Sequence, residues 1–314
     1  MARVRVGSAG VAAEIQDTPE HLSYSQLTML HPAYRYSCAR KWAYKYRLGL
    51  ADETSAPLLM GRAFDEAANA FFRARLRDVE PLEAGAAALE VGHNSLDSLL
   101  HEAPLSILGA TDDPENRIGE YLDLLTAALA AFLNTEGKRE AAVVQDRHGF
   151  TIMLDPTHIM PVVGYSDRIE PDGTLVDHKL TGSPRWNKEG EWDEEWVAER
   201  RDQLLVYWLA RNAEEKRTGK PLEPPLNGRG RLVVTYHKLG LLKPQVRVYE
   251  LTLSLEDGGQ ELLARLALAA QIVHEDRYPA RPGQACRFCS YLGRCRDDEA
   301  ARGRPFFELV EVPF

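Results

Sequence analysis

The stretch from residue 164 to 179, GYSDRIEPDGTLVDHK, constrains the fold of this chain more than any other part of the sequence. Two short apolar runs lie on either side of a Pro-Asp-Gly triplet at residues 171–173, which is typical of a tight turn. We therefore predict two antiparallel strands joined as a hairpin. Such a hairpin brings Asp167 on the first strand beside Asp177 on the second.

The second predicted strand carries three polar residues in a row. Side chains alternate across a strand, so Asp177 and Lys179 share one face and His178 points the other way. Paired carboxylates offer the oxygen ligands that Mg²⁺ and Mn²⁺ prefer. A lysine beside them can orient an attacking water and stabilise charge on a phosphate. The alternative is a solvated hairpin with ordinary surface charges.

The sequence around this hairpin predicts a mixture of strands and helices. Residues 141–180 hold four short apolar runs typical of strands, AAVVQD, FTIML, MPVVGYSDRIE and TLVDHKL, and two more strands are expected at GRLVVTYHKL and QVRVYELTL. We expect helices from Leu22 (with Ser23 or Ser25 as N-cap), from 57 to about 93, at 115–137, at 194–216 and at 254–275, with a polar loop at 94–114.

Composition limits the class of protein. Of 314 residues, 44% are hydrophobic and 27% are charged, which is enough apolar side chain for a buried core. No apolar run is long enough to cross a bilayer, and the N-terminus lacks a signal-peptide core, so we expect an intracellular, cytoplasmic protein. The net charge of −9 argues against nucleic-acid binding over the whole surface, but it allows a local basic groove.

The four cysteines are Cys38, Cys286, Cys289 and Cys295, three of them within ten residues. In an intracellular chain such a cluster indicates metal ligation rather than disulfide bonds. Four thiolates suit a structural zinc ion as well as an iron–sulfur cluster. Because one ligand is nearly 250 residues from the others, either group would close a very large loop and contribute directly to folding.

Two further pairs are undistinctive on their own. Gln203 and Tyr207 are four residues apart on a predicted helix and therefore lie on one face. Gly61 and Asp65 lie on an earlier predicted helix. The simplest interpretation is that these are ordinary surface and core residues, with Asp65 an exposed helix residue.

Residues 34–47 mix five basic and five aromatic residues. Aromatic faces and cations together suit single-stranded DNA. The alternative is a helix that packs its aromatic rings inward and leaves its charges in solvent. The residues that we single out as candidate nucleic-acid contacts are Arg35, Arg40, Lys41, Trp42, Tyr44 and Lys45.

Taken in order, these motifs resemble the RecB-like family of PD-(D/E)XK nucleases over roughly residues 22–298. The resemblance rests on G-x-x-x-acid at 61–65, G-x-x-D at 164–167, D-x-K at 177–179 and Q-x-x-x-Y at 203–207. The early cysteine followed by C-x2-C-x5-C resembles the iron–sulfur branch of that family, which includes the CRISPR-associated exonucleases and the AddB nuclease domain.

The resemblance implies an α/β fold, a PD-(D/E)XK core in which helices flank a central mixed sheet, with a helical N-terminal elaboration and a C-terminal iron–sulfur segment. It implies Mg²⁺- or Mn²⁺-dependent hydrolysis of DNA, as an exonuclease on single strands or ends, in repair, recombination, phage or CRISPR-adaptation processing. The alternative is a DNA-binding or interaction subunit of a recombination or CRISPR-adaptation complex in which cutting is secondary.

The resemblance also assigns roles to single residues. Asp167 and Asp177 become metal ligands, with the His178 carbonyl as a third, and Lys179 becomes the catalytic lysine. Gln203 and Tyr207 position the lysine and the DNA. Asp65 stands where the family usually has histidine, and we expect it to be a ligand as well. The four cysteines hold a [4Fe–4S] cluster.

The expected organisation is one nuclease domain over residues 22–298, between a flexible leader at 1–21 and a tail at 299–314. Within the domain, residues 22–137 are helical, 138–253 form the sheet with the active site, and 254–298 contain a helix and the cysteine cluster.

Overall fold

The computed structural model describes residues 21–52, 54–108, 113–155, 158–238, 243–283, 286–287 and 289–302. The expected leader, apart from His21, and most of the expected tail lie outside the described residues. The chain divides into two compact units, each built from separate stretches. The first unit is Met1–Glu53, Thr151–Val162 and Leu263–Phe314, and the second is Thr54–Phe150 and Val163–Leu262.

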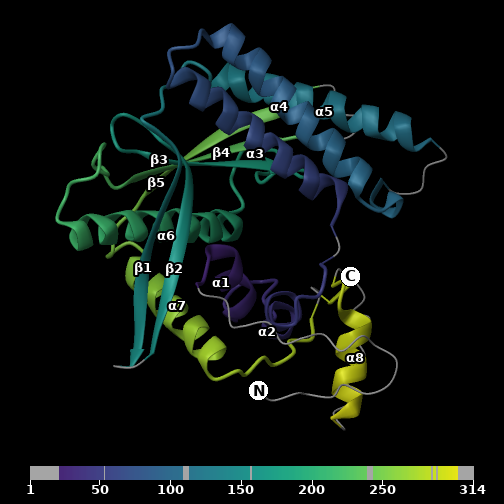
Figure 1. Cartoon of the computed structure of the whole chain (residues 1–314), viewed down its shortest axis with the longest axis vertical. Helices are drawn as coiled ribbons and strands as arrows, with labels where there is room; N and C mark the ends of the chain where they lie inside the picture. The colour runs from purple at the N-terminus through teal and green to yellow at the C-terminus, as the bar shows by residue number, and fades with distance from the viewer. Residues whose placement is uncertain are drawn as a thin grey trace. The chain divides into compact units, whose positions relative to one another are not determined.

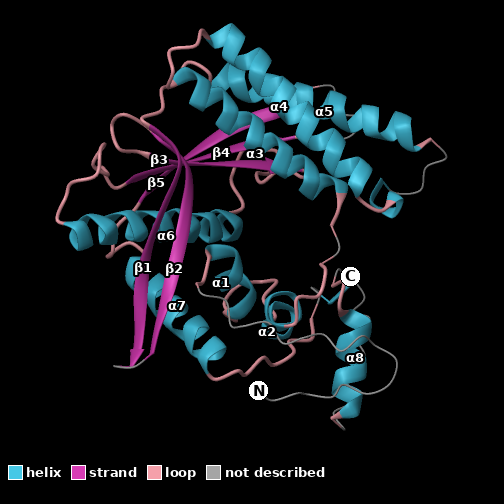
Figure 2. Cartoon of the chain, in the orientation of Figure 1, coloured by secondary structure: helices cyan, strands magenta, loops and turns pink. Residues whose placement is uncertain are grey.

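A five-stranded mixed sheet runs in the order β1 (Val143–Asp155), β2 (His158–Ile169), β3 (Leu175–Thr181), β4 (Arg229–Tyr236) and β5 (Gln245–Thr252) (Figures 1 and 2). Strands β2 and β3 pair antiparallel, β3 and β4 parallel, and β4 and β5 antiparallel. A parallel pair needs a long crossover, which α6 (Glu194–Thr218) supplies. This crossover carries the chain directly from the predicted catalytic strand to the predicted Q-x-x-x-Y helix.

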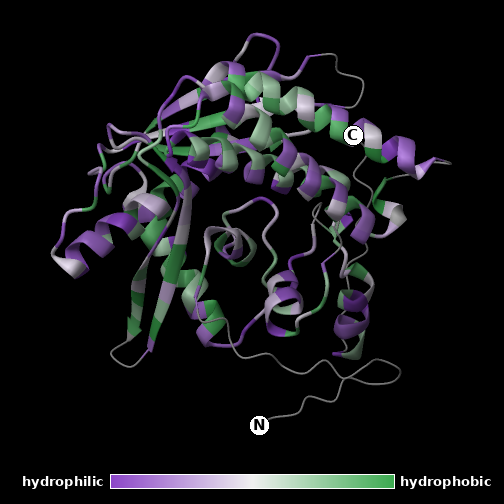
Figure 3. Ribbon diagram, turned by 45° about the horizontal axis from the view of Figure 1, so that its top comes forward, coloured by the Kyte–Doolittle hydropathy of each residue, from purple (hydrophilic) through white to green (hydrophobic). Residues whose placement is uncertain are grey.

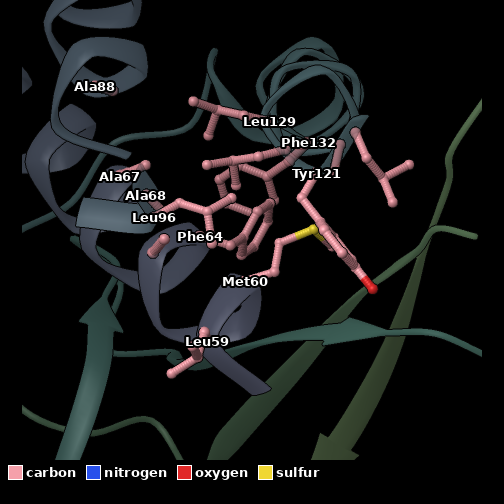
Figure 4. Close-up of a cluster of buried hydrophobic side chains, with 14 of the residues drawn as sticks. Leu59, Met60, Phe64, Ala67, Ala68, Ala88, Leu96, Tyr121, Leu129 and Phe132 are labelled. Atoms are coloured by element: carbon pink, nitrogen blue, oxygen red, sulfur yellow. The ribbon is translucent and has the colours of Figure 1, made fainter. Parts of the chain in front are cut away.

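Helices cover both faces of the sheet in the second unit. Helices α3 (Ala56–Arg75), α4 (Pro81–Glu102) and α5 (Pro114–Glu136) bury a core with Val176 and Val233 on one face (Figure 4). The neighbouring residues Leu232 and Val234 face the other way and pack with Trp196 of α6. This alternation places α6 opposite the three-helix layer. The helices carry both hydrophilic and hydrophobic residues along their length, as expected of elements with one buried side (Figure 3).

The expectation of one helix up to about residue 93, followed by a polar loop, was wrong. The chain breaks after α3, where Asp78 has a φ of 59°, and a new helix begins at Pro81. That helix continues to Glu102, and a 3-10 turn, η2 (Leu105–Leu108), follows it. The polar sequence of 94–102 is still helical because Leu96 and Leu100, four residues apart, are buried in the core.

Smaller differences from expectation concern the ends of elements. The runs AAVVQD and FTIML belong to one strand, β1, rather than two. Helix α7 spans Gly259–His274 rather than 254–275. The helix expected from Leu22 is α1 (Tyr24–Leu30), and its N-cap is Ser23 without a side-chain capping hydrogen bond.

The first unit joins segments from both ends of the chain. It holds α1, α2 (Ala39–Trp42), the π-helical turn η1 (Ala43–Arg47), most of α7 and α8 (Leu292–Ala301). Trp42 stacks on Tyr278, with ring centroids 5.2 Å apart, and the Tyr44 hydroxyl donates to Asp298 at 2.6 Å. No helix among the described residues is long and apolar enough to span a membrane.

A buried ion network ties β2 and β4 to the end of α5. Arg168 donates to Glu136 at 2.7 Å and to Glu170 at 3.0 Å. Arg231 donates to Glu136 at 2.9 Å and to Glu170 at 2.7 Å. Arg168 is fully buried, and its guanidinium lies 4.0 Å from the centroid of the Phe72 ring. Charges can be buried in this way only because each meets opposite charge and hydrogen bonds.

Candidate active site

The predicted hairpin is confirmed. Arg168 pairs with Val176 and Ile169 with Leu175, and the turn between them lies at residues 170–174. Gly173 has a φ of +88°, and an added Cβ would lie 1.9 Å from the carbonyl oxygen of Pro225, so only glycine fits there. The register continues toward Asp167 and Asp177, which face each other as the sequence predicted.

Strands β2 and β3 stop exchanging backbone hydrogen bonds at this point, and side chains take over. The Asp167 Oδ2 atom accepts a hydrogen bond of 2.8 Å from the backbone N–H of His178. In an extended strand the N–H and C=O of one residue point to the same side, so the His178 carbonyl also faces Asp167. That is the side on which a third ligand was expected.

Lys179 and Asp177 lie on one face of β3, as predicted. The Lys179 Nζ atom donates to Asp177 Oδ1 at 2.8 Å, while the buried Asp177 Oδ2 atom has no partner within the described part of the chain. The His178 ring points the other way and packs between Phe72 and Phe132. Asp177 therefore keeps one carboxylate oxygen available inside the site.

The carboxylates repel one another because they are buried together. Burial, followed by the charge of Asp177, raises the pKa of Asp167 to about 7. Burial and the charges of Asp167 and Asp177 raise the pKa of Asp65 well above its ordinary value. Burial alone would lower the pKa of Lys179, but the carboxylates outweigh it and raise that pKa. Lys179 is therefore cationic at neutral pH, and the site has an excess of negative charge.

Asp65 belongs to this cluster rather than to the exposed surface of α3. The carboxylates of Asp167 and Asp177 and the ammonium of Lys179 all shift its pKa, which requires that they lie close to it. Its neighbour Glu66 is exposed, as expected for a residue turned about 100° around the helix. The structure thus brings Asp65 to the same place as the hairpin residues.

Gln203 and Tyr207 share one face of α6, and the Gln203 amide donates a hydrogen bond to the Tyr207 hydroxyl. Burial and the charges of Asp177 and Asp167 raise the pKa of Tyr207 well above its usual value, so the phenol stays neutral. The Tyr207 ring lies directly on Gly164, where an added Cβ would come within 2.6 Å of Tyr207 Cδ1. The glycine of the G-x-x-D motif is required because any side chain would displace this ring.

Sequence reasoning missed Arg200, which is three residues before Gln203 and on the same face of α6. Its charge opposes the rise in pKa of both Lys179 and Tyr207, so its guanidinium lies near the site. The spacing 200, 203 and 207 follows the helical repeat and could have identified it.

The aromatic and basic segment 34–47 is largely interior to the first unit. Trp42 is fully buried and Tyr44 is 2% exposed, so neither ring has a face for a nucleotide base. Arg40 is buried in an ion pair with Glu299 at 3.1 Å. The expectation that these three bind nucleic acid was therefore wrong: their side chains fill the core. Arg35 is exposed, and Lys41 and Lys45 are half-buried beside Asp52.

The four cysteines line a single pocket of the first unit, together with Arg40, Lys41, Tyr44, Ala280, Arg281, Pro282 and Leu292. Burial, followed by the neighbouring Cys38, raises the pKa of Cys295 to about 11. Cys289 is also close enough to Cys38 and Cys286 for them to raise its pKa. The sulfur of Cys38 thus meets the late cysteines across some 250 residues of sequence, as the spacing predicted.

The donor sets at both places suit metal ligation, although neither is drawn together. Among the residues that the structure describes, no three His, Cys, Asp or Glu side chains lie close enough to hold a metal ion. The unpartnered Asp177 Oδ2 atom and the mutual repulsion of three carboxylates are what a divalent cation would satisfy. Asp65, Asp167 and Asp177 therefore fit Mg²⁺ or Mn²⁺.

Comparison with known proteins agrees with this geometry. A solved structure of a candidate exonuclease from Eubacterium rectale is similar in fold, with a TM-score of 0.53, 14% identity and 88% of each chain covered. A second, of the protein SSO0001, has a TM-score of 0.40 at 13% identity and covers 90% of this chain and 88% of that one. No curated protein matches significantly. The model of the PD-(D/E)XK nuclease superfamily matches residues 21–296, and this chain therefore belongs to that superfamily.

Proposed function

We propose that this chain is a Mg²⁺- or Mn²⁺-dependent DNA nuclease of the RecB-like type that acts as an exonuclease on single strands or ends. The observation that supports this most strongly is the convergence of Asp65, Asp167 and Asp177 on Lys179 at the point where β2 and β3 diverge. Three carboxylates and one lysine in a buried site form a suitable set for phosphodiester hydrolysis.

Each protein group has a distinct part in the proposed reaction. A bound Mg²⁺ or Mn²⁺ ion would act as a Lewis acid on the phosphate and lower the pKa of water. Asp65, Asp167, Asp177 and the His178 carbonyl would hold the ion. Lys179, kept cationic by these carboxylates, donates hydrogen bonds to the attacking water and to a phosphate oxygen as negative charge develops on it.

Tyr207 and Gln203 fix the position of these groups. The Tyr207 oxygen accepts from the Gln203 amide, so the phenol hydrogen is left to donate toward the carboxylate and phosphate side of the site. The ring is held by Gly164 and the phenol stays neutral, so the donor is present over a wide pH range. The pair therefore orients substrate and carboxylates without exchanging a proton.

Asp65→Asn is expected to lower the cleavage of end-labelled DNA by about a hundredfold at limiting metal, because a ligand charge is lost. The wild-type protein should cut single- or double-stranded DNA in Mg²⁺ or Mn²⁺ and not in EDTA. Asp65→His should keep activity but raise the ratio of Mn²⁺ to Mg²⁺ rates, because imidazole favours softer metals.

Glu66→Gln is the matched control, because it removes the same charge one step along the helix and outside the site. It should cut DNA like the wild type across the whole metal titration. Equal losses in the Asp65 and Glu66 variants would contradict the role of Asp65 as a ligand. A wild-type protein that cuts no DNA under any metal condition would contradict the proposed function itself.

We also propose that the cysteine pocket holds a [4Fe–4S] cluster, which would place the chain in the iron–sulfur branch of the RecB-like nucleases. The support is that one pocket gathers all four thiols, with Arg40 and Lys41 beside them. Cationic side chains favour the thiolate form that metals bind. Four sulfurs from the two ends of one unit would fasten Cys38 to the segment that carries Cys295.

Protein purified without oxygen is expected to be brown and to contain about four iron atoms, following the four-thiolate stoichiometry. Cys38→Ala should lose the colour and lower the melting temperature, because the metal site contributes folding free energy. Metal analysis and visible absorption make the measurement. Zinc in place of iron would overturn the cluster but leave the nuclease assignment intact, and equal stability of the variant would show that the pocket has no structural role.

A further inference from the structure

Two arginines beside the candidate active site stack on the same tryptophan. The guanidinium carbons of Arg185 and Arg200 each lie 5.3 Å from the centroid of the Trp196 ring. Trp196 is 8% exposed and packs with Val197, Leu232 and Val234 in the core under α6. Because the ring is fixed by the core, it holds both guanidiniums in place and reduces the entropy that a ligand would have to overcome.

Neither guanidinium is committed to another protein group. The Nε atoms of both arginines are buried without a hydrogen-bond partner, and neither residue forms an ion pair with the carboxylates that the structure describes. Other arginines of the second unit are engaged: Arg168 and Arg231 with Glu136 and Glu170, and Arg201 with Asp257. A stacked, unpaired arginine presents several N–H donors in one plane, which matches the oxygens of a phosphate.

The segment that carries Arg185 is firmly held. Residues 182–193 link the catalytic strand β3 to α6, and Trp186 bridges to Trp192 within them. The guanidinium of Arg247 lies 4.8 Å from the Trp186 centroid and donates to the Gly190 carbonyl at 3.1 Å. The Arg185 carbonyl accepts from Asp193, the N-cap of α6, at 2.8 Å. Arg185 is therefore preorganised rather than on a loose loop.

The position of the pair relative to the site decides its function. Arg200 is near enough to Lys179 and Tyr207 for its charge to act on both, and Arg185 shares its tryptophan. We propose that Arg185 and Arg200, fixed by Trp196, form a phosphate clamp that holds the DNA strand by a phosphodiester next to the one that is cleaved. This inference rests on the proposed nuclease function and extends it to substrate positioning.

The clamp is tested by replacing one arginine at a time. Arg185→Gln and Arg200→Gln are expected to weaken binding of a short single-stranded oligonucleotide in EDTA by about tenfold each, because each removes charge-assisted hydrogen bonds. The slope of log affinity against log salt should fall by about one per arginine. The Michaelis constant in Mn²⁺ should rise with little change in kcat. Fluorescence anisotropy measures the first two quantities, and single-turnover cleavage the third.

Arg201→Gln is the matched control, because it removes the same charge from the adjacent residue, which pairs with Asp257. It should leave both the affinity and the salt slope unchanged. Arg200→Lys should be intermediate, because it keeps the charge but loses the planar stacked donors. Thermal melts show whether each variant is folded, and Trp196→Phe, which keeps an aromatic face, should retain most of the affinity.

The position of the contact is tested with oligonucleotides that carry one uncharged methylphosphonate at a defined position. In the wild type, one position near the cut should weaken binding, and Arg200→Gln should remove that effect. If the wild type cuts DNA but the glutamine variants bind with unchanged affinity and salt slope, the clamp is wrong and the nuclease stands. If the wild type neither binds nor cuts DNA, the failure lies with the proposed function.

Discussion

Replacing Lys179 by alanine is expected to lower the rate of DNA cleavage by about 10²–10³-fold, which is typical when a donor to the developing charge is removed. Lys179 is the cation at the centre of three buried carboxylates, and its ammonium donates to Asp177 at 2.8 Å. Binding of DNA should change only severalfold, because a lysine that acts on the reacting phosphate contributes mainly to the transition state. Single-turnover cleavage in Mn²⁺, with anisotropy in EDTA, separates the two effects.

Lys138→Ala is the control for Lys179, because Lys138 is an exposed lysine of the same unit, beyond the end of α5. It should cut at the wild-type rate. Removing Lys179 also leaves the carboxylates unbalanced, so the metal-free variant should melt earlier and regain stability when Mn²⁺ is added. A folded Lys179→Ala protein that cuts at near the wild-type rate would remove this residue from the mechanism.

Glu136→Ala should lower the free energy of unfolding by about 3–5 kcal/mol, because it leaves two buried arginines short of a counter-charge. Glu136 is 1% exposed and accepts hydrogen bonds from both Arg168 and Arg231. Urea unfolding at neutral pH, followed by circular dichroism, measures the loss. Glu140→Ala removes an exposed glutamate four residues later and should change stability little.

The pH dependence separates charge from packing. Burial alone would raise the pKa of Glu136, but the hydrogen bonds and charges of Arg231 and Arg168 outweigh it and lower that pKa. A depressed carboxyl pKa stabilises the fold above the ordinary value and loses this effect as pH falls through the folded pKa. The difference between wild type and variant should therefore shrink in acid. A difference that stays constant down to pH 3 would mean that packing alone is involved.

The catalytic hairpin could be predicted from sequence because its signals are local. A Pro-Asp-Gly turn and the alternation of side chains fix which residues face Asp167 and which turn away, and both were confirmed. The ion network beneath the hairpin could not be predicted in the same way. Arg168 has the sequence signature of a solvent-exposed residue, and only the meeting of α5, β2 and β4 makes its burial possible.

The same reason explains the other differences. Trp42 and Tyr44 alternate with cations and so resemble a nucleic-acid surface, but their partners Tyr278 and Asp298 lie more than 230 residues away. Arg185 and Arg200 become a pair only because Trp196 lies between them in space. The missed helix break at Asp78 was local, and Pro81 after it was the signal that a new helix begins.

The composition of the first unit has a consequence for biosynthesis. During translation Cys38, Trp42 and Tyr44 leave the ribosome early, whereas their partners on Tyr278, Cys295 and Asp298 emerge at the other end of the chain. Most of the second unit is made in between and can fold first. The nascent N-terminal segment therefore waits with its aromatic side chains uncovered, a substrate for chaperones, and a product that stops before residue 278 should be recognised and degraded.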